Sequence, residues 1–272
     1  MNRTAIYALL VIVLLAVSPS YATTTVVSDC GSCGFQTWST ANLNENGLPY
    51  WDAPSADGLD KSIGHYLTGT GGFAGAPGVP GAINYYGLSI ASGGAPANNF
   101  YFNTTASAFF STIAIEVAGL ANSNKFGWYE AGNPTNRTQI FAGVDGAGTT
   151  KTFTPTTNFG FYIETGDGFF FYTQSSFNNN PSCDTQGYSG CVTLDETQHQ
   201  HFALFRQTAG TYWIGVEDRS LSSESVTYNG IKRVGDYQDL VLRFSEVPEP
   251  STYALFGVGL LALGAIRRRN KI

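Results

Sequence analysis

Residues 211–217 read Thr-Tyr-Trp-Ile-Gly-Val-Glu, and this stretch is the clearest indication of the fold. Successive side chains of a β-strand point to opposite faces, so Tyr212, Ile214 and Val216 should share one face of a strand. Residues of this kind favour a half-buried pleated surface. Two further stretches near the end of the chain have the same character: 201–205, His-Phe-Ala-Leu-Phe, and 239–244, Asp-Leu-Val-Leu-Arg-Phe.

Outward from this region, shorter β-rich stretches cover the middle of the chain. Residues 159–164 and 168–173 are joined by Thr165-Gly166-Asp167, a strong hairpin signal. No apolar pattern of helical period and useful length occurs between residues 23 and 246. We therefore expect an all-β fold, an antiparallel β-sandwich or jelly roll of roughly ten strands. The other expected strands are 85–90, 109–117, 125–129, 138–144 and 151–153, with a turn at Asp145-Gly146.

The N-terminus has the pattern of a secretory signal peptide. Arg3 precedes a continuous apolar stretch from Ala5 to Val17, and small residues lead up to Ala22. This pattern predicts an N-terminal signal helix that signal peptidase removes by cutting after Ala22. The chain is therefore expected to be exported across the inner membrane.

The last 25 residues combine a polar elbow, an apolar run and a basic stop. The run holds 14 residues, from Tyr253 to Ile266. As a helix it would span roughly 21 Å, whereas the core of a bilayer is about 30 Å thick. Basic residues keep their end of such a segment in the cytoplasm. The pattern favours a sorting signal that is held in the membrane and then cut, over an ordinary tail anchor.

This tail resembles the PEP-CTERM sorting signal of Gram-negative, biofilm-forming bacteria. Three parts match in order: the Pro248-Glu249-Pro250 tripeptide, the apolar run with its glycines, and Arg267-Arg268-Arg269. The resemblance implies transient anchoring by a C-terminal hydrophobic helix and cleavage near Pro248–Pro250 by an exosortase-type enzyme. The product would be released to the cell envelope or the extracellular matrix. The expected organisation is a signal peptide (1–22), a β-sandwich domain (23–246) and a sorting signal (247–272).

The expected mature domain is acidic. The chain has 14 basic and 20 acidic side chains. Loss of residues 1–22 and 248–272 leaves nine and nineteen, a net charge of −10. Nucleic acid and anionic membrane surfaces would repel such a domain, and neither is an expected partner of it. An acidic exported domain is instead suited to binding cations.

Four cysteines fall into two close pairs. Cys30 and Cys33 are separated by two residues, and Cys183 and Cys191 flank a polar segment. In an exported chain we expect two local disulfides, although four cysteines permit three pairings. A redox motif at Cys30–Cys33 is disfavoured because no βαβ pattern follows it.

Residues 198–244 are similar to the C-terminal part of exported bacterial β-sandwich proteins of the DUF4114 type. The family pattern usually has Asn where this chain has Gln238. The resemblance implies a fold more than an activity. The matching pieces are 201–205, His-Phe-Ala-Leu-Phe; 213–218, Trp-Ile-Gly-Val-Glu-Asp; and 235–241, Gly-Asp-Tyr-Gln-Asp-Leu-Val.

Four acids in this region form a candidate metal site. Glu217 and Asp218 end one expected strand, while Asp236 and Asp239 precede the next. If these strands pair antiparallel, all four carboxylates meet at one end of the sheet and repel one another unless a cation neutralises them. Ca²⁺ is the cation that prefers such oxygen ligands. The alternative is ordinary turn chemistry, in which Asp218 and Asp236 accept backbone hydrogen bonds and arginines pair with neighbouring acids.

The other candidate sites each lack a residue, a motif or a distance that their chemistry requires. His199 and His201 would share a strand face, but no third metal ligand is evident, and His201 is expected to be structural. No nucleophile elbow, zinc-protease motif or phosphate-binding loop occurs. Glu116 and Glu130 would suit a glycosidase only if their carboxyl groups lay about 5–9 Å apart.

Two classes of function follow. The first is a non-catalytic protein of the cell surface or extracellular matrix, associated with the exopolysaccharide of a biofilm. The alternative is a Ca²⁺-dependent, lectin-like module in which Trp51, Trp128 or Tyr129 stacks on sugar rings. An enzyme acting on glycosides is a less favoured third reading.

Overall fold

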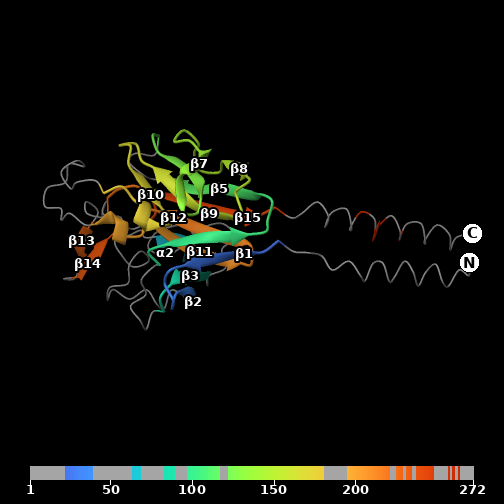
Figure 1. Cartoon of the computed structure of the whole chain (residues 1–272), viewed down its shortest axis with the longest axis horizontal. Helices are drawn as coiled ribbons and strands as arrows, with labels where there is room; N and C mark the ends of the chain where they lie inside the picture. Colours follow the sequence, from blue (N-terminus) through green and yellow to red (C-terminus); the bar gives the residue numbers. More distant parts are fainter. Residues whose placement is uncertain are drawn as a thin grey trace, which may run out of the picture.

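The computed structural model describes residues 22–38, 63–68, 83–89, 97–116, 122–180, 195–220, 225–228, 231–234 and 237–247, together with Gly257, Gly259, Leu260 and Leu263. Most of these residues lie in two antiparallel sheets (Figure 1). Within this described part, no helix combines the length and the apolarity needed to cross a bilayer. The expected all-β class is confirmed.

The first sheet has the strand order β1-β4-β9-β6-β7, and β10 also pairs with β9. The second sheet has the order β2-β3-β11-β12-β15-β5-β8. The strands of the first sheet are β1 (Thr24–Ser28), β4 (Phe100–Thr104), β6 (Lys125–Glu130), β7 (Asn133–Phe141), β9 (Asn158–Glu164) and β10 (Phe170–Tyr172). Those of the second are β2 (Gly34–Trp38), β3 (Ile83–Gly87), β5 (Phe109–Glu116), β8 (Thr150–Phe153), β11 (Phe202–Thr208), β12 (Thr211–Val216) and β15 (Leu240–Glu246).

The remaining elements are short. A separate hairpin pairs β13 with β14. They are β13 (Ser225–Tyr228), β14 (Ile231–Val234), the helix α2 (Ile63–Thr68) and the 3₁₀ turns η3 (Ser175–Phe177) and η5 (Glu196–Gln198).

The two sheets pack face to face across an aromatic core, as in a β-sandwich. Phe102 of β4 lies 5.7 Å from Tyr212 of β12 and 5.3 Å from Phe244 of β15, measured between ring centroids. Phe161 of β9 lies 5.1 Å from Phe244. All four rings are buried. Aromatic pairs at these distances add to the stabilisation that comes from the burial of their apolar surface.

The predicted alternation along 211–217 is confirmed. Tyr212, Ile214 and Val216 lie in the core between the sheets. Trp213 lies on the opposite face of the second sheet, in a second cluster that α2 covers. Gly215 is required there, since a Cβ would lie 2.4 Å from the Tyr237 carbonyl oxygen. The second cluster comprises Ile63, Tyr66, Leu67, Ile83, Tyr85, Ala203, Phe205, Trp213, Tyr237 and Val241.

The predicted strands are recovered with shifted ends, and several others were missed. The hairpin at Thr165-Gly166-Asp167 joins β9 to β10, with Gly168 in the left-handed conformation at φ +83°. The strands β1, β2, β4, β13 and β14 were not predicted. The jelly-roll connectivity and the two flanking helices stay predictions, because residues 1–21 lie outside the described part and only four positions of the C-terminal run lie within it.

Candidate metal centre

Three of the four predicted acids meet where β12 and β15 pair. The register places Val216 opposite Leu240, so Glu217 and Asp218 emerge beside Asp239. One ligand oxygen from each of these acids lies within 4.8 Å of the others. Oxygens bound to one Ca²⁺ at 2.3–2.6 Å are at most roughly 5 Å apart, so this spacing suits a single ion. The fourth predicted ligand, Asp236, lies outside the described residues.

The cluster is largely buried. Glu217 is 3% exposed and Asp218 is 1% exposed, whereas Asp239 is partly buried. Burial raises the pKa of the Asp218 carboxyl group, although a hydrogen bond from Asn124 and the charge of Arg219 act in the opposite direction. A carboxylate held in such a place needs compensating partners.

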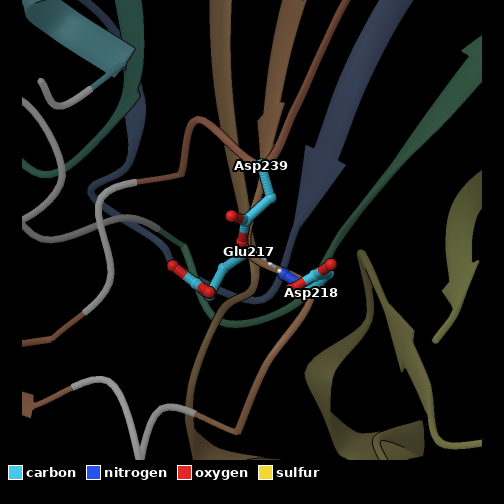
Figure 2. Close-up of side chains that lie close together, drawn as sticks. All are labelled: Glu217, Asp218 and Asp239. Atoms are coloured by element: carbon cyan, nitrogen blue, oxygen red, sulfur yellow. Dashed lines mark hydrogen bonds between the residues drawn. The ribbon is translucent and has the colours of Figure 1, made fainter. Parts of the chain in front are cut away.

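Turn chemistry accounts for part of this arrangement. Asp239 Oδ2 accepts a hydrogen bond of 2.9 Å from the Asp218 backbone N–H, and Glu217 Oε1 accepts a longer one of 3.4 Å from the Arg219 N–H. Figure 2 shows the Asp239 side chain directed at the backbone between Glu217 and Asp218, whose own side chains leave to opposite sides. These bonds fix the positions of the acids relative to one another.

The hydrogen bonds of these turns do not satisfy Asp218 Oδ1. Its partner atom Oδ2 accepts a hydrogen bond of 2.6 Å from Asn124 Nδ2. Oδ1 is buried and has no hydrogen-bond donor among the described residues. Asn124 is itself fixed by the Gly166 N–H, which donates to Asn124 Oδ1 at 2.9 Å. A cation is the partner that would satisfy an anionic oxygen held rigidly in this way.

A buried, hydrogen-bonded pair, His201 and Glu196, lies next to the cluster. His201 Nε2 lies 3.0 Å from Glu196 Oε2, and both side chains are 0% exposed. Ser220 Oγ donates to the other Glu196 oxygen. His201 Nδ1 lies 3.1 Å from the Glu217 carbonyl oxygen, which only accepts, so Nδ1 carries a hydrogen. This network agrees with the structural role expected of His201, and it fixes the backbone that presents Glu217.

The packing of His201 explains why it is fully enclosed. Its ring stacks on Phe171 of β10, with 3.6 Å between centroids and 8° between planes. The importance of Glu196 was missed from the sequence, since nothing in its neighbourhood distinguishes it from a surface acid at the start of a 3₁₀ turn. Within the described residues, neither histidine joins the metal-type cluster.

The other candidate residues identified from the sequence are scattered. Cys30 and Cys33 form the predicted disulfide. Ala22 is partly buried against the aromatic core. The predicted Cys183–Cys191 pair, the Pro248-Glu249-Pro250 tripeptide, the cluster Arg267-Arg268-Arg269 and Trp51 all lie outside the described residues.

The proposed acid pair and stacking platform are not formed. Glu116 ends β5 in the second sheet, opposite Leu240, whereas Glu130 ends β6 in the first sheet, opposite Phe159. These positions are at opposite ends of the sandwich, so the two carboxyl groups do not share a cleft. Trp128 and Tyr129 are 8% and 0% exposed, so neither is a sugar-stacking surface.

A polar cavity of about 430 Å³ lies beside the disulfide. Asn99 in its wall is held on both sides: its Oδ1 accepts from the Ser176 N–H at 3.1 Å, and its Nδ2 donates to Asp29 Oδ2 at 2.6 Å. Leu88 and Ala97 supply apolar surface. The described residues of the lining supply amides, hydroxyls and one carboxylate, and none of them is Lys or Arg.

The buried pair generates a prediction on stability. Glu196→Ala should lower the free energy of unfolding by about 3–5 kcal/mol, because it leaves the buried His201 Nε2 without its hydrogen-bond partner. Glu196→Gln should cost clearly less, since its amide can donate to a neutral His201 Nε2 and accept from Ser220. Urea unfolding of both variants measures the difference. Equal losses for Ala and Gln would contradict the hydrogen-bond assignment.

Comparison with known proteins identifies the tail. Residues 246–269 match the family model of the PEP-CTERM protein-sorting motif. The match covers the C-terminal end alone, and the DUF4114-like similarity of residues 198–244 stays a prediction. No curated protein and no solved structure matches the chain. The motif implies export and processing at the membrane by an exosortase-type sorting enzyme.

Proposed function

We propose that this chain is an exported, non-catalytic β-sandwich protein that is sorted through its C-terminal signal and then acts in the cell envelope or extracellular matrix. The match to the sorting motif at residues 246–269 carries this proposal. The fold supports it, because β15 ends at Glu246, where the motif begins. The folded domain and the sorting signal are therefore directly joined and have separate roles.

We further propose that Ca²⁺ stabilises the released domain. The cation would bind Glu217, Asp218 and Asp239, with Asp236 as a fourth candidate from the sequence. It would neutralise three acids that the fold brings together and would give Asp218 Oδ1 its missing partner. The proposed role of the ion is to hold the ends of β12 and β15, not to catalyse a reaction.

Calcium should raise the thermal stability of the domain. A free ion concentration about 100-fold above the dissociation constant adds roughly 2.7 kcal/mol, which corresponds to a rise in Tm of about 5–10 °C for a domain of this size. Asp218→Asn should abolish this rise. In the presence of chelator it should unfold no earlier than the wild type, because a neutral amide removes a buried charge.

The matched control is Glu130→Gln, which removes an acid at the opposite end of the sandwich without removing a ligand. This variant should keep the full response to Ca²⁺. Differential scanning calorimetry with Ca²⁺ and with chelator gives both values. A wild-type Tm that is the same in the two conditions would mean that the acids only accept hydrogen bonds in their turns and bind no Ca²⁺.

The sorting role makes a separate prediction. Replacing Pro248, Glu249 and Pro250 together by Ala should leave the precursor in the membrane fraction and reduce the released form to background. Ser251→Ala with Thr252→Ala is the control and should be released normally. Immunoblots of membranes and medium from a host with an exosortase-type enzyme measure both forms. Undiminished release of the triple variant would contradict sorting through this motif.

The polar cavity favours a second candidate function, the binding of a neutral sugar. Its volume of about 430 Å³ falls in the usual range for small-molecule sites. Amide and carboxylate groups together can both donate to and accept from sugar hydroxyls, and the described part of the lining, which holds the Asp29 carboxylate and no Lys or Arg, disfavours anionic sugars. This site would replace the buried Trp128 and Tyr129 as the basis of a lectin-like role.

Asn98 in this cavity provides the test, since its side chain is exposed. Asn98→Ala should weaken binding of neutral oligosaccharides, prepared from the host exopolysaccharide, by about 2–10-fold, the effect of one lost hydrogen bond. Asn122→Ala, an exposed amide outside the cavity, should leave affinity unchanged. Isothermal titration calorimetry measures the affinities. No binding by the wild type would exclude this second function.

A further inference from the structure

The first and the last residues of the sandwich domain are both hydrogen-bonded to the β4–β5 turn, at one end of the sandwich. The Thr105 N–H donates to the Thr23 carbonyl oxygen at 3.0 Å, next to the first strand. The Val247 N–H donates to the Ala108 carbonyl oxygen, also at 3.0 Å, directly after the last strand. Residues 105 and 108 belong to one turn, between β4 and β5. Figure 1 shows the chain leaving the sandwich on this side at both β1 and β15.

Almost no chain separates these turns from the predicted processing points. Cleavage after Ala22 falls immediately before Thr23, and Pro248–Pro250 begins immediately after Val247. Since extended chain covers at most about 3.6 Å per residue, Pro250 lies within roughly 11 Å of the turns. The apolar run starts at Tyr253 and is within roughly 22 Å of them. The domain therefore has little freedom to rotate away from the membrane that holds the tail.

The turns 104–108, 154–158 and 208–211 at this end carry no charged side chain, although Glu130 ends β6 at the same end. They bear small hydroxyl, methyl and amide groups, and Glu246 beside them is the last residue of β15. The Thr104 N–H donates to the Thr157 carbonyl oxygen at 2.8 Å, which ties two of the turns together. The sequences are 104–108, Thr-Thr-Ala-Ser-Ala; 154–158, Thr-Pro-Thr-Thr-Asn; and 208–211, Thr-Ala-Gly-Thr.

The opposite end is charged. It carries the acids Glu217, Asp218 and Asp239, and Lys125 forms an ion pair of 2.7 Å with Glu164. Strand β9 runs between the two ends and has seven residues, which correspond to roughly 20 Å. This separation is about twice the Debye length at physiological ionic strength, so the two ends experience separate electrostatic environments.

We propose that this end, through the uncharged turns 104–108, 154–158 and 208–211, rests on the bilayer surface while the sorting signal is held there. This inference depends on the proposed sorting function and adds an orientation to it. A domain of net charge −10 is repelled by anionic lipids, and each charge near the surface contributes about 1 kcal/mol. Presenting these uncharged turns lowers the repulsion and points the cluster of Glu217, Asp218 and Asp239 away from the membrane.

The test compares the same substitution at the two ends. Ser107 lies in the β4–β5 turn and Ser123 precedes Lys125 at the opposite end; both are exposed. The exported form, residues 23–272, is partitioned by flotation into vesicles of phosphatidylethanolamine and phosphatidylglycerol. Ser107→Lys should raise the partition coefficient about fivefold, which corresponds to about 1 kcal/mol for a charge at an anionic surface. Ser123→Lys should leave it close to the wild-type value, and high salt should remove the difference.

The outcomes separate the orientation from the sorting role. Equal gains for Ser107→Lys and Ser123→Lys, or a larger gain for Ser123→Lys, would overturn the orientation while wild-type flotation still supports a membrane-held tail. A gain for Ser107→Lys that persists in high salt or on phosphatidylcholine vesicles would also overturn it, because the effect would not be electrostatic. A wild-type chain that does not float at all would count against the proposed sorting function itself.

Discussion

The antiparallel pairing of β12 with β15 is the constraint on which the rest of the structure depends. It stacks Tyr212 on Phe244, with ring centroids 5.0 Å apart, at the centre of the aromatic core. At one end the same pairing sets Glu217 and Asp218 beside Asp239. At the other end it delivers Val247 to the turn at Ala108, directly before the sorting signal. One strand pair thus connects the core, the candidate metal centre and the exit of the chain.

The end of the β12–β15 pair near Glu217, Asp218 and Asp239 contains two kinds of buried acid. Glu196 is compensated within the fold by His201 and Ser220, so its burial requires nothing from outside. Asp218 accepts a hydrogen bond from Asn124 on one oxygen and is near the charge of Arg219, but its other oxygen has no hydrogen-bond donor among the described residues. Burying a carboxylate costs several kcal/mol unless its partners are complete. The difference between these two acids is the physical reason to look for a cation at Asp218 and not at Glu196.

Sequence patterns predicted the features that depend on local alternation. The two faces of β12, its pairing with β15 and the meeting of Glu217, Asp218 and Asp239 all follow from strand geometry and short sequence distance. Features that depend on distant contacts were missed. The β1 strand pairs with β4, where Thr24 and Thr104 are 80 residues apart in the chain, and Asn124 reaches Asp218 from the other sheet. The burial of Glu196 and Trp128 depends on packing from both sheets, which a linear pattern does not contain.

The position of β15 also constrains when the domain can fold. This strand is the last among the described residues, yet it lies inside the second sheet, between β12 and β5. The sheet therefore stays divided until residue 246 is available, and the sorting signal begins at that same point. During export, completion of the fold and arrival of the tail at the membrane must nearly coincide. The acids of the candidate metal centre come together in that step. Folding, the proposed binding of Ca²⁺ and the retention of the tail would in this way be coupled through a single strand.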